Sequence, residues 1–145
     1  MKKIIFVLLA SLAVLSMASC GEKAESSNAF IEQSYEDTSS WKKSLLAKAG
    51  LAEIAEPEGE KVFTEDENGN FKFTMTPADS SSLNGMAQSF KSKAAHFADD
   101  ISHSPIPNES GAETEFTMSY TLNNKKVSIK MSLENSMLTV EFTFE

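Results

Sequence analysis

Residues 115–144 read EFTMSYTLNNKKVSIKMSLENSMLTVEFTF, and they alternate apolar and polar side chains almost without exception. Successive side chains of a β-strand point to opposite faces, so this alternation predicts strands with one buried face and one solvated face. Two interruptions, Asn123-Asn124 and Asn135-Ser136, divide the stretch into three strands. We therefore expect a three-stranded antiparallel meander at the end of the chain. Its inward positions are Phe116, Met118, Tyr120, Leu122, Val127, Ile129, Met131, Leu133, Leu138, Val140, Phe142 and Phe144.

The same two interruptions predict the register of the meander. Two-residue hairpin loops require positive φ angles, which Asn tolerates better than most residues. The first turn places Tyr120 opposite Val127, and the second places Met131 opposite Val140. Both registers set apolar side chains opposite apolar ones, and a slip of one residue would turn them to solvent.

A second hairpin is predicted from residues 61–65 and 71–76. A two-residue turn between them would direct Phe63 away from the buried face. A three-residue loop with Gly69 in the left-handed conformation instead places Phe63 opposite Phe73. The parity of the apolar residues therefore favours the longer loop.

Two helices are predicted, over residues 40–49 and 81–102. Thr38-Ser39-Ser40 offers N-cap oxygens to the first helix, and Gly50 follows it as a left-handed C-cap. Within the second helix, Gly85 would let a neighbouring segment approach closely. That helix carries one apolar stripe at helical spacing, formed by Leu83, Met86, Phe90, Ala94, Phe97 and Ile101.

The predicted order of elements is therefore α-β-β-α-β-β-β. This order indicates an α+β domain in which two helices pack on an antiparallel sheet that ends in the meander. The domain is expected over residues 38–145, a length sufficient to bury one core.

The first residues of the chain have the pattern of an export signal. Met1-Lys2-Lys3 is followed by an apolar run over residues 4–15 and then by small residues up to Cys20, as in secretory signal peptides. Met17-Ala18-Ser19-Cys20 resembles the lipobox of bacterial lipoproteins, although Met17 stands where Leu is more common. The resemblance covers only these first twenty residues.

This resemblance implies that residues 1–19 are a lipoprotein signal peptide and that Cys20 becomes the lipidated first residue of the mature protein. Residues 20–37 would then be the lipidated Cys and a flexible tether. Several acyl chains on one Cys anchor a protein stably to a membrane. The expected location is the bacterial cell envelope, and the outer membrane in a bacterium with two membranes, because Gly21 rather than Asp follows Cys20.

The charge balance excludes one class of partner. The chain has 21 acidic residues against 13 basic ones, and every basic residue is Lys. Nucleic-acid affinity rests on neutralising phosphates with cations, so an acidic chain without Arg is not expected to bind nucleic acid.

His96, Asp99, Asp100 and His103 are the strongest candidates for a metal site. On a continuous helix, offsets of 3, 4 and 7 residues would bring these side chains onto neighbouring turns, where they could share a metal ion. The alternative is that the two Asp residues are ordinary solvated groups and that His near a helix C-terminus interacts with the helix dipole. We favour the second interpretation and predict no metal and no cofactor.

No pattern in the chain indicates an enzyme. It lacks a Gly-x-Ser-x-Gly nucleophile motif and a glycine-rich phosphate loop. We therefore expect a non-catalytic binding or interaction domain on a membrane anchor, with a protein partner. The alternatives are a metal-binding envelope protein and a carrier of small apolar ligands. The carrier would have a pocket between the second helix and the sheet, lined by Met86, Phe90, Met118 and Met131.

Overall fold

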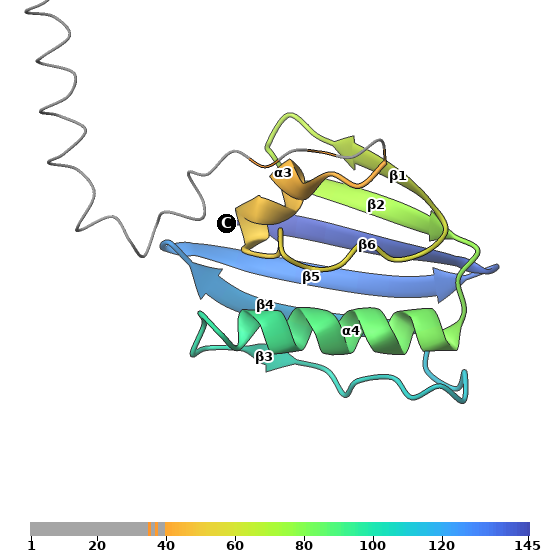
Figure 1. Ribbon diagram of the computed structural model, residues 1–145. Coiled ribbons are helices and arrows are strands. Elements are labelled where there is room, and N and C mark those ends of the chain that lie inside the picture. The colour runs from red at the N-terminus through yellow and green to blue at the C-terminus, as the bar shows by residue number, and fades with distance from the viewer. Residues whose placement is uncertain (1–34, 36, 38–39) are drawn as a thin grey trace, which may run out of the picture. The chain divides into compact units, whose positions relative to one another are not determined.

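The structure is a computed structural model that describes Tyr35, Asp37 and residues 40–145, within one compact unit, Ser34–Glu145 (Figure 1). Its regular elements are α3 (Lys43–Leu46), the short 3-10 helix η1 (Ala47–Ala49), β1 (Glu60–Glu65), β2 (Phe71–Thr76), α4 (Ser80–Ala94), β3 (Ser102–His103), β4 (Glu115–Leu122), β5 (Lys125–Glu134) and β6 (Met137–Phe144). The strands form one antiparallel sheet in the order β1-β2-β6-β5-β4-β3. The α+β class is confirmed.

The meander has the predicted register. Tyr120 lies opposite Val127 across β4 and β5, and Met131 lies opposite Val140 across β5 and β6. Both connecting turns have two residues at positive φ, with angles of 51° and 64° at Asn123 and Asn124. These are the φ values that a two-residue hairpin turn needs to match the right-handed twist of its strands.

The β1–β2 hairpin also has the predicted parity. Phe63 lies opposite Phe73, and Gly69 adopts a φ of 83° in the loop. The Asp66 carbonyl accepts from the Gly69 N–H, while the Asp66 N–H donates to the Asn70 carbonyl. The three residues between Asp66 and Asn70 therefore form the type I turn with a bulge that apolar parity favours.

The prediction for the second helix is wrong at its C-terminal end. The helix α4 ends at Ala94 rather than Ser102, and Ser102–His103 forms the short strand β3 against Ser119 and Met118 of β4. The physical reason is that β4 would otherwise be an edge strand with unpaired backbone groups. The chain leaves the helix and pairs with these groups through β3. The predicted order of elements therefore lacks one strand, which falls between α4 and β4.

Two side chains near β3 complete the protection of that edge. The Asp100 carboxylate accepts from both the backbone N–H and the hydroxyl of Thr121, at 3.0 and 2.6 Å. The Ser104 hydroxyl accepts from the Thr117 N–H at 3.0 Å, and the Ser104 N–H donates to the Thr117 carbonyl. These bonds satisfy β4 backbone groups on either side of the β3 pairing.

The first helix is shorter than predicted. It begins at Lys43 with Lys42 as its N-cap, so the predicted start at Ser40 is wrong. The Asp37 carboxylate accepts from the Ser44 N–H at 2.8 Å, and so takes the place of a neighbouring cap residue. At the other end, Gly50 has the predicted left-handed conformation, with a φ of 76°.

Hydrogen bonds after η1 complete a Schellman motif. The Gly50 N–H donates to the Ala47 carbonyl, and the Leu51 N–H donates to the Leu46 carbonyl. The motif reverses the chain direction and starts the connector of residues 51–59, which leads to β1.

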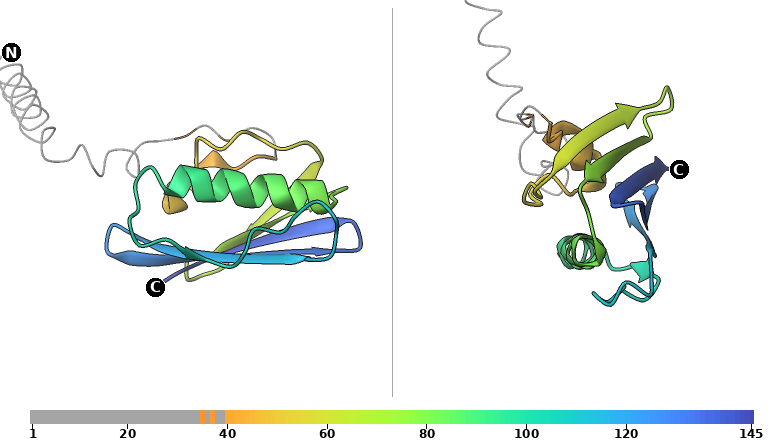
Figure 2. Two further views of the ribbon diagram at one scale, coloured as in Figure 1. Left: turned by 90° about the horizontal axis from the view of Figure 1, so that it is seen from below. Right: turned by 90° about the vertical axis from the view of Figure 1, so that its right-hand side faces the viewer.

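The core lies between the helices and one face of the sheet. Figure 2 shows α3 and α4 on the same side of the strands. Leu83, Met86, Phe90 and Ala94 of the predicted stripe are buried there, and the Phe90 and Phe142 rings pack 5.9 Å apart. The opposite face of the sheet carries the polar side chains.

Candidate binding groove

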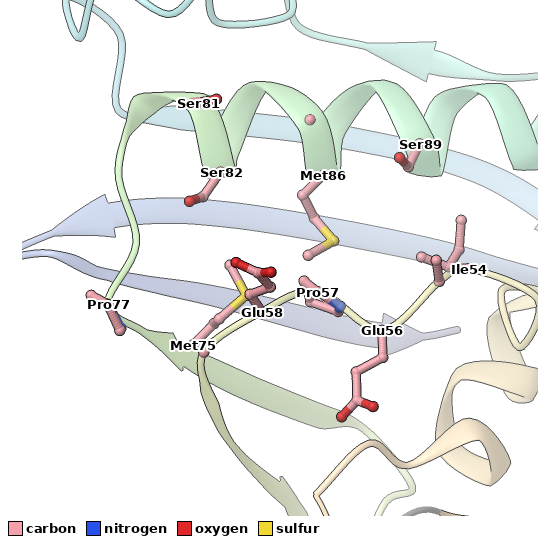
Figure 3. A pocket seen from close by; sticks show the side chains of 13 residues that line it. Ile54, Glu56, Pro57, Glu58, Met75, Pro77, Ser81, Ser82, Met86 and Ser89 are labelled. Carbon is pink, nitrogen blue, oxygen red and sulfur yellow. The ribbon is translucent and has the colours of Figure 1, made fainter.

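An open groove runs between the N-terminal half of α4 and the connector that precedes β1 (Figure 3). Its volume is about 600 Å³, which lies within the range of ligand-binding clefts in proteins. The residues that line it are Ile54, Ala55, Glu56, Pro57, Glu58, Gly59, Met75, Pro77, Ser81, Ser82, Gly85, Met86 and Ser89. We call this feature the connector groove.

The floor of the connector groove is apolar. Ile54, Met75 and Met86 are buried, with 9%, 2% and 6% of their surfaces exposed, and each comes from a different segment. Figure 3 shows Met86 pointing from α4 toward the connector. Met side chains are flexible and polarizable, so a floor that includes two of them can adapt to an apolar group of varied shape.

The connector is held against the sheet by a close backbone approach. Gly59 has a φ of 107°, a backbone conformation that residues with a side chain rarely adopt. A Cβ at this position would lie 3.0 Å from the Thr76 carbonyl oxygen, so only glycine fits without a shift of the backbone. Gly59 therefore fixes the distance between the connector and β2.

Gly85 leaves the helix wall of the groove open. The residue is exposed on α4, and a Cβ at this position would meet no other atom within 4 Å. The prediction that Gly85 lets a neighbouring segment pack closely is therefore wrong. The missing side chain adds space to the groove instead. Ser81 and Ser89 lie one turn before and after Gly85, and their short side chains occupy little of the groove.

The two acidic side chains of the connector that line the groove, Glu56 and Glu58, differ in their partners. Lys61, whose side chain is only 5% exposed, lies 3.2 Å from a Glu56 carboxylate oxygen and donates to the Pro57 carbonyl at 2.6 Å. In Figure 3 the Glu56 carboxylate points away from α4, whereas Glu58 lies on the groove side of the connector. Among the residues that the structure describes, no cation pairs with Glu58.

The N-terminus of α4 is capped by Asp79, which precedes the helix. The Asp79 carboxylate accepts from the Ser82 N–H at 2.9 Å and from the Ser82 hydroxyl at 3.1 Å. The Asp79 N–H in turn donates to the Ser82 hydroxyl, which completes a capping box. The hydrogen bonds from Ser82 hold the pKa of the Asp79 carboxyl below its ordinary value. The helix end is thereby supplied with a negative charge of its own.

The uncovered face of the sheet is a second hollowed surface. One hollow of about 590 Å³ lies over β3 to β6, and another of about 400 Å³ lies over β1, β2 and β6. Glu141 lines both, and the register places it between Lys72 and Lys130. Thr and Ser side chains, such as Thr143 and Ser128, surround this charged row. The solvated polar face predicted from the alternation is thus present.

The four metal-site candidates are not on one helix. Because α4 ends at Ala94, His96, Asp99, Asp100 and His103 all follow it, and the helical spacing on which the candidate site rests does not exist. Asp100 binds Thr121, and His103 lies in β3, with its Nδ1 2.6 Å from the Ser104 carbonyl oxygen. Within residues 40–145 no three His, Cys, Asp or Glu side chains are grouped as metal ligands.

The residues predicted to line a carrier pocket belong to the packed core. Met86, Phe90, Met118 and Met131 are each no more than 6% exposed. Of the four, only Met86 reaches the connector groove, at its floor. Glu58 and Gly85, by contrast, were not predicted to face a common site. They are 27 positions apart in the sequence, and no local pattern links them.

Cys20, the predicted signal peptide and nearly all of the predicted tether lie outside the described residues. No helix in the described part of the chain is long and apolar enough to cross a membrane. Comparisons with protein-family models, with curated proteins and with solved structures found no match to this chain.

Proposed function

We propose that this protein is a lipid-anchored lipoprotein of the bacterial cell envelope whose domain binds a partner, without catalysis, in the connector groove. The observation that carries the proposal is the groove itself, an open cleft with an apolar floor beside a packed core. Clefts of this size that combine an apolar floor with a few polar groups are the usual form of ligand sites.

The anchor in this proposal is Cys20, in the lipobox-like sequence Met17-Ala18-Ser19-Cys20. Acyl chains on Cys20 would hold the domain at a membrane, and in a bacterium with two membranes at the outer one. Exchange of Cys20 for Ala removes the thiol that would carry the lipid. We expect Cys20→Ala to move the protein from the membrane fraction to the soluble fraction, and retention in the membrane would contradict the anchor.

Gly85 provides a direct test of the groove. Gly85→Leu should fill the groove without disturbing the core, because a side chain at this position starts in open space. Gly85→Ala is the matched control, since it removes the glycine but adds only one methyl group. Each variant is compared with wild type for binding of pentapeptides selected from a random library on the immobilised wild-type protein.

The expected result is that the selected peptides bind wild type and Gly85→Ala but not Gly85→Leu. Thermal unfolding of all three proteins establishes that Gly85→Leu is folded. Equal binding to Gly85→Leu, or the failure of any peptide to be enriched, would contradict a binding function of the connector groove.

A further inference from the structure

We infer that the partner of the connector groove is an extended peptide segment that presents a basic side chain beside apolar ones. This inference rests on the proposed function and names the chemistry of the partner. Three features of the groove favour such a partner: its negative charge, its apolar floor and the backbone of its connector wall.

Charge complementarity selects a cation. Glu58 lines the groove with its carboxylate unpaired among the described residues, and exposed Glu53 lies on the same connector. Lys61, the cation that contacts this connector, is buried and already pairs with Glu56 and the Pro57 carbonyl. An incoming ammonium or guanidinium group would therefore meet a free carboxylate and no competing positive charge.

The apolar floor of the groove favours a partner with an apolar side chain next to its basic one. Ile54, Met75 and Met86 present aliphatic carbon and thioether sulfur to the space beside Glu58. A Lys or Arg side chain has an aliphatic stem that packs on such a surface while its charged end stays near water. An adjacent apolar side chain can fill the remaining space over the two Met residues.

The connector wall favours an extended backbone as the carrier of these groups. The backbone N–H groups of Ala55, Glu56 and Glu58 donate no hydrogen bond within the described residues. A peptide laid along the connector can pair with such groups, as extended ligands do when they are recognised through main-chain hydrogen bonds. The groove is also open to solvent rather than enclosed, so an extended segment can enter it from the surface.

The test uses three fluorescein-labelled peptides that differ at one central position. Each has the form Gly-Leu-X-Leu-Gly, where X is lysine, norleucine or glutamate. Fluorescence anisotropy at low salt measures their dissociation constants for the protein as purified from cells. We expect the lysine peptide to bind about fivefold more tightly than the norleucine peptide, which is the contribution of an exposed ion pair. The glutamate peptide should bind most weakly.

Two variants test whether the Glu58 carboxylate causes the preference for the lysine peptide. Glu58→Gln should reduce the ratio of lysine-peptide to norleucine-peptide affinity to about one. Glu60→Gln is the matched control, because Glu60 is exposed and close in sequence but does not line the groove. Higher salt should weaken the lysine preference in wild type, since screening acts on exposed charges.

Failure of this inference is distinguishable from failure of the proposed function. If all three peptides bind equally and Gly85→Leu abolishes their binding, the groove is a binding site but its partner is not cationic. A lysine preference that survives in Glu58→Gln also overturns the inference. If none of the peptides binds at concentrations up to about 1 mM, both the inference and the binding function of the groove are contradicted.

Discussion

The phenolic hydroxyl of Tyr120 on β4 donates a 2.6 Å hydrogen bond to the Ala49 carbonyl at the end of η1. The two residues are 71 positions apart, and the bond is buried. It connects the meander to the segment from which the connector starts. Tyr120 is 1% exposed, and its ring packs edge-on against Phe97 at 5.6 Å. The position of the connector groove thus depends in part on a single buried polar contact.

Tyr120→Phe should destabilise the domain by about 1–3 kcal/mol, because it leaves the buried Ala49 carbonyl without its donor. Chemical denaturation followed by intrinsic fluorescence measures this change. Ser128→Ala, on the solvated face of β5, provides a control for substitution within the meander. An equal effect of the two substitutions would show that the Tyr120 bond does not contribute as proposed.

The same tyrosine predicts a loss of stability at alkaline pH. Burial raises the pKa of the Tyr120 phenol above its ordinary value of 10.0. The folded state therefore keeps this proton when the unfolded state begins to lose it, so unfolding becomes more favourable as the pH rises above that value. Tyr120→Phe removes the titrating group. We expect the variant to show a smaller decrease in unfolding free energy between pH 9 and pH 11 than wild type, and an identical decrease would contradict the assignment.

Asp100 predicts a change of stability on the acid side. Hydrogen bonds from the Thr121 hydroxyl and backbone N–H hold the pKa of the Asp100 carboxyl below its ordinary value of 3.8. The ionised form is thus favoured by folding, and its contribution to stability is present above that value and is lost as the pH falls through the folded pKa.

Asp100→Asn should therefore make stability less dependent on pH over the acid range, as measured by urea denaturation from about pH 5 downward. Asp99→Asn is the matched control, because Asp99 is the exposed neighbour and its side chain makes no hydrogen bond within the described part of the chain. A pH dependence that is unchanged in Asp100→Asn would exclude this carboxylate as a contributor.

Gly85→Ala should stabilise the domain. Gly in a helix interior costs about 1 kcal/mol relative to Ala, and the added methyl group at this position meets no neighbour. We expect a gain of about that size in the free energy of unfolding. A loss of stability would show that Gly85 is close-packed, and it would also remove the basis for using Gly85→Leu to fill the groove.

The sequence predicted those parts of the fold that depend on local patterns. Alternation over residues 115–144 determined three strands and their registers, because each turn joins strands that are adjacent in sequence. The end of α4 could not be found in this way. Phe97 and Ile101 continue the apolar spacing and are half-buried, although the chain has already left the helix and moves toward the edge of β4.

The candidate site was less accessible to prediction than the fold. The connector groove is formed where the connector lies against α4, and neither segment shows a periodic pattern that points to the other. Gly85 was predicted to let a neighbouring segment approach closely, whereas the structure leaves the space beside it empty. In the sequence, Glu58 is one of several acidic residues in a polar connector. The structure distinguishes it from Glu56, because Glu56 pairs with Lys61 and Glu58 does not.

The most direct measurement is NMR of the methionine methyl groups during titration with the lysine peptide. Met75 and Met86 lie at the floor of the connector groove, whereas Met131 is fully buried in the meander. Occupation of the groove predicts saturable shifts at Met75 and Met86 and none at Met131. Shifts that leave both groove methionines unchanged would place the peptide elsewhere and contradict the account.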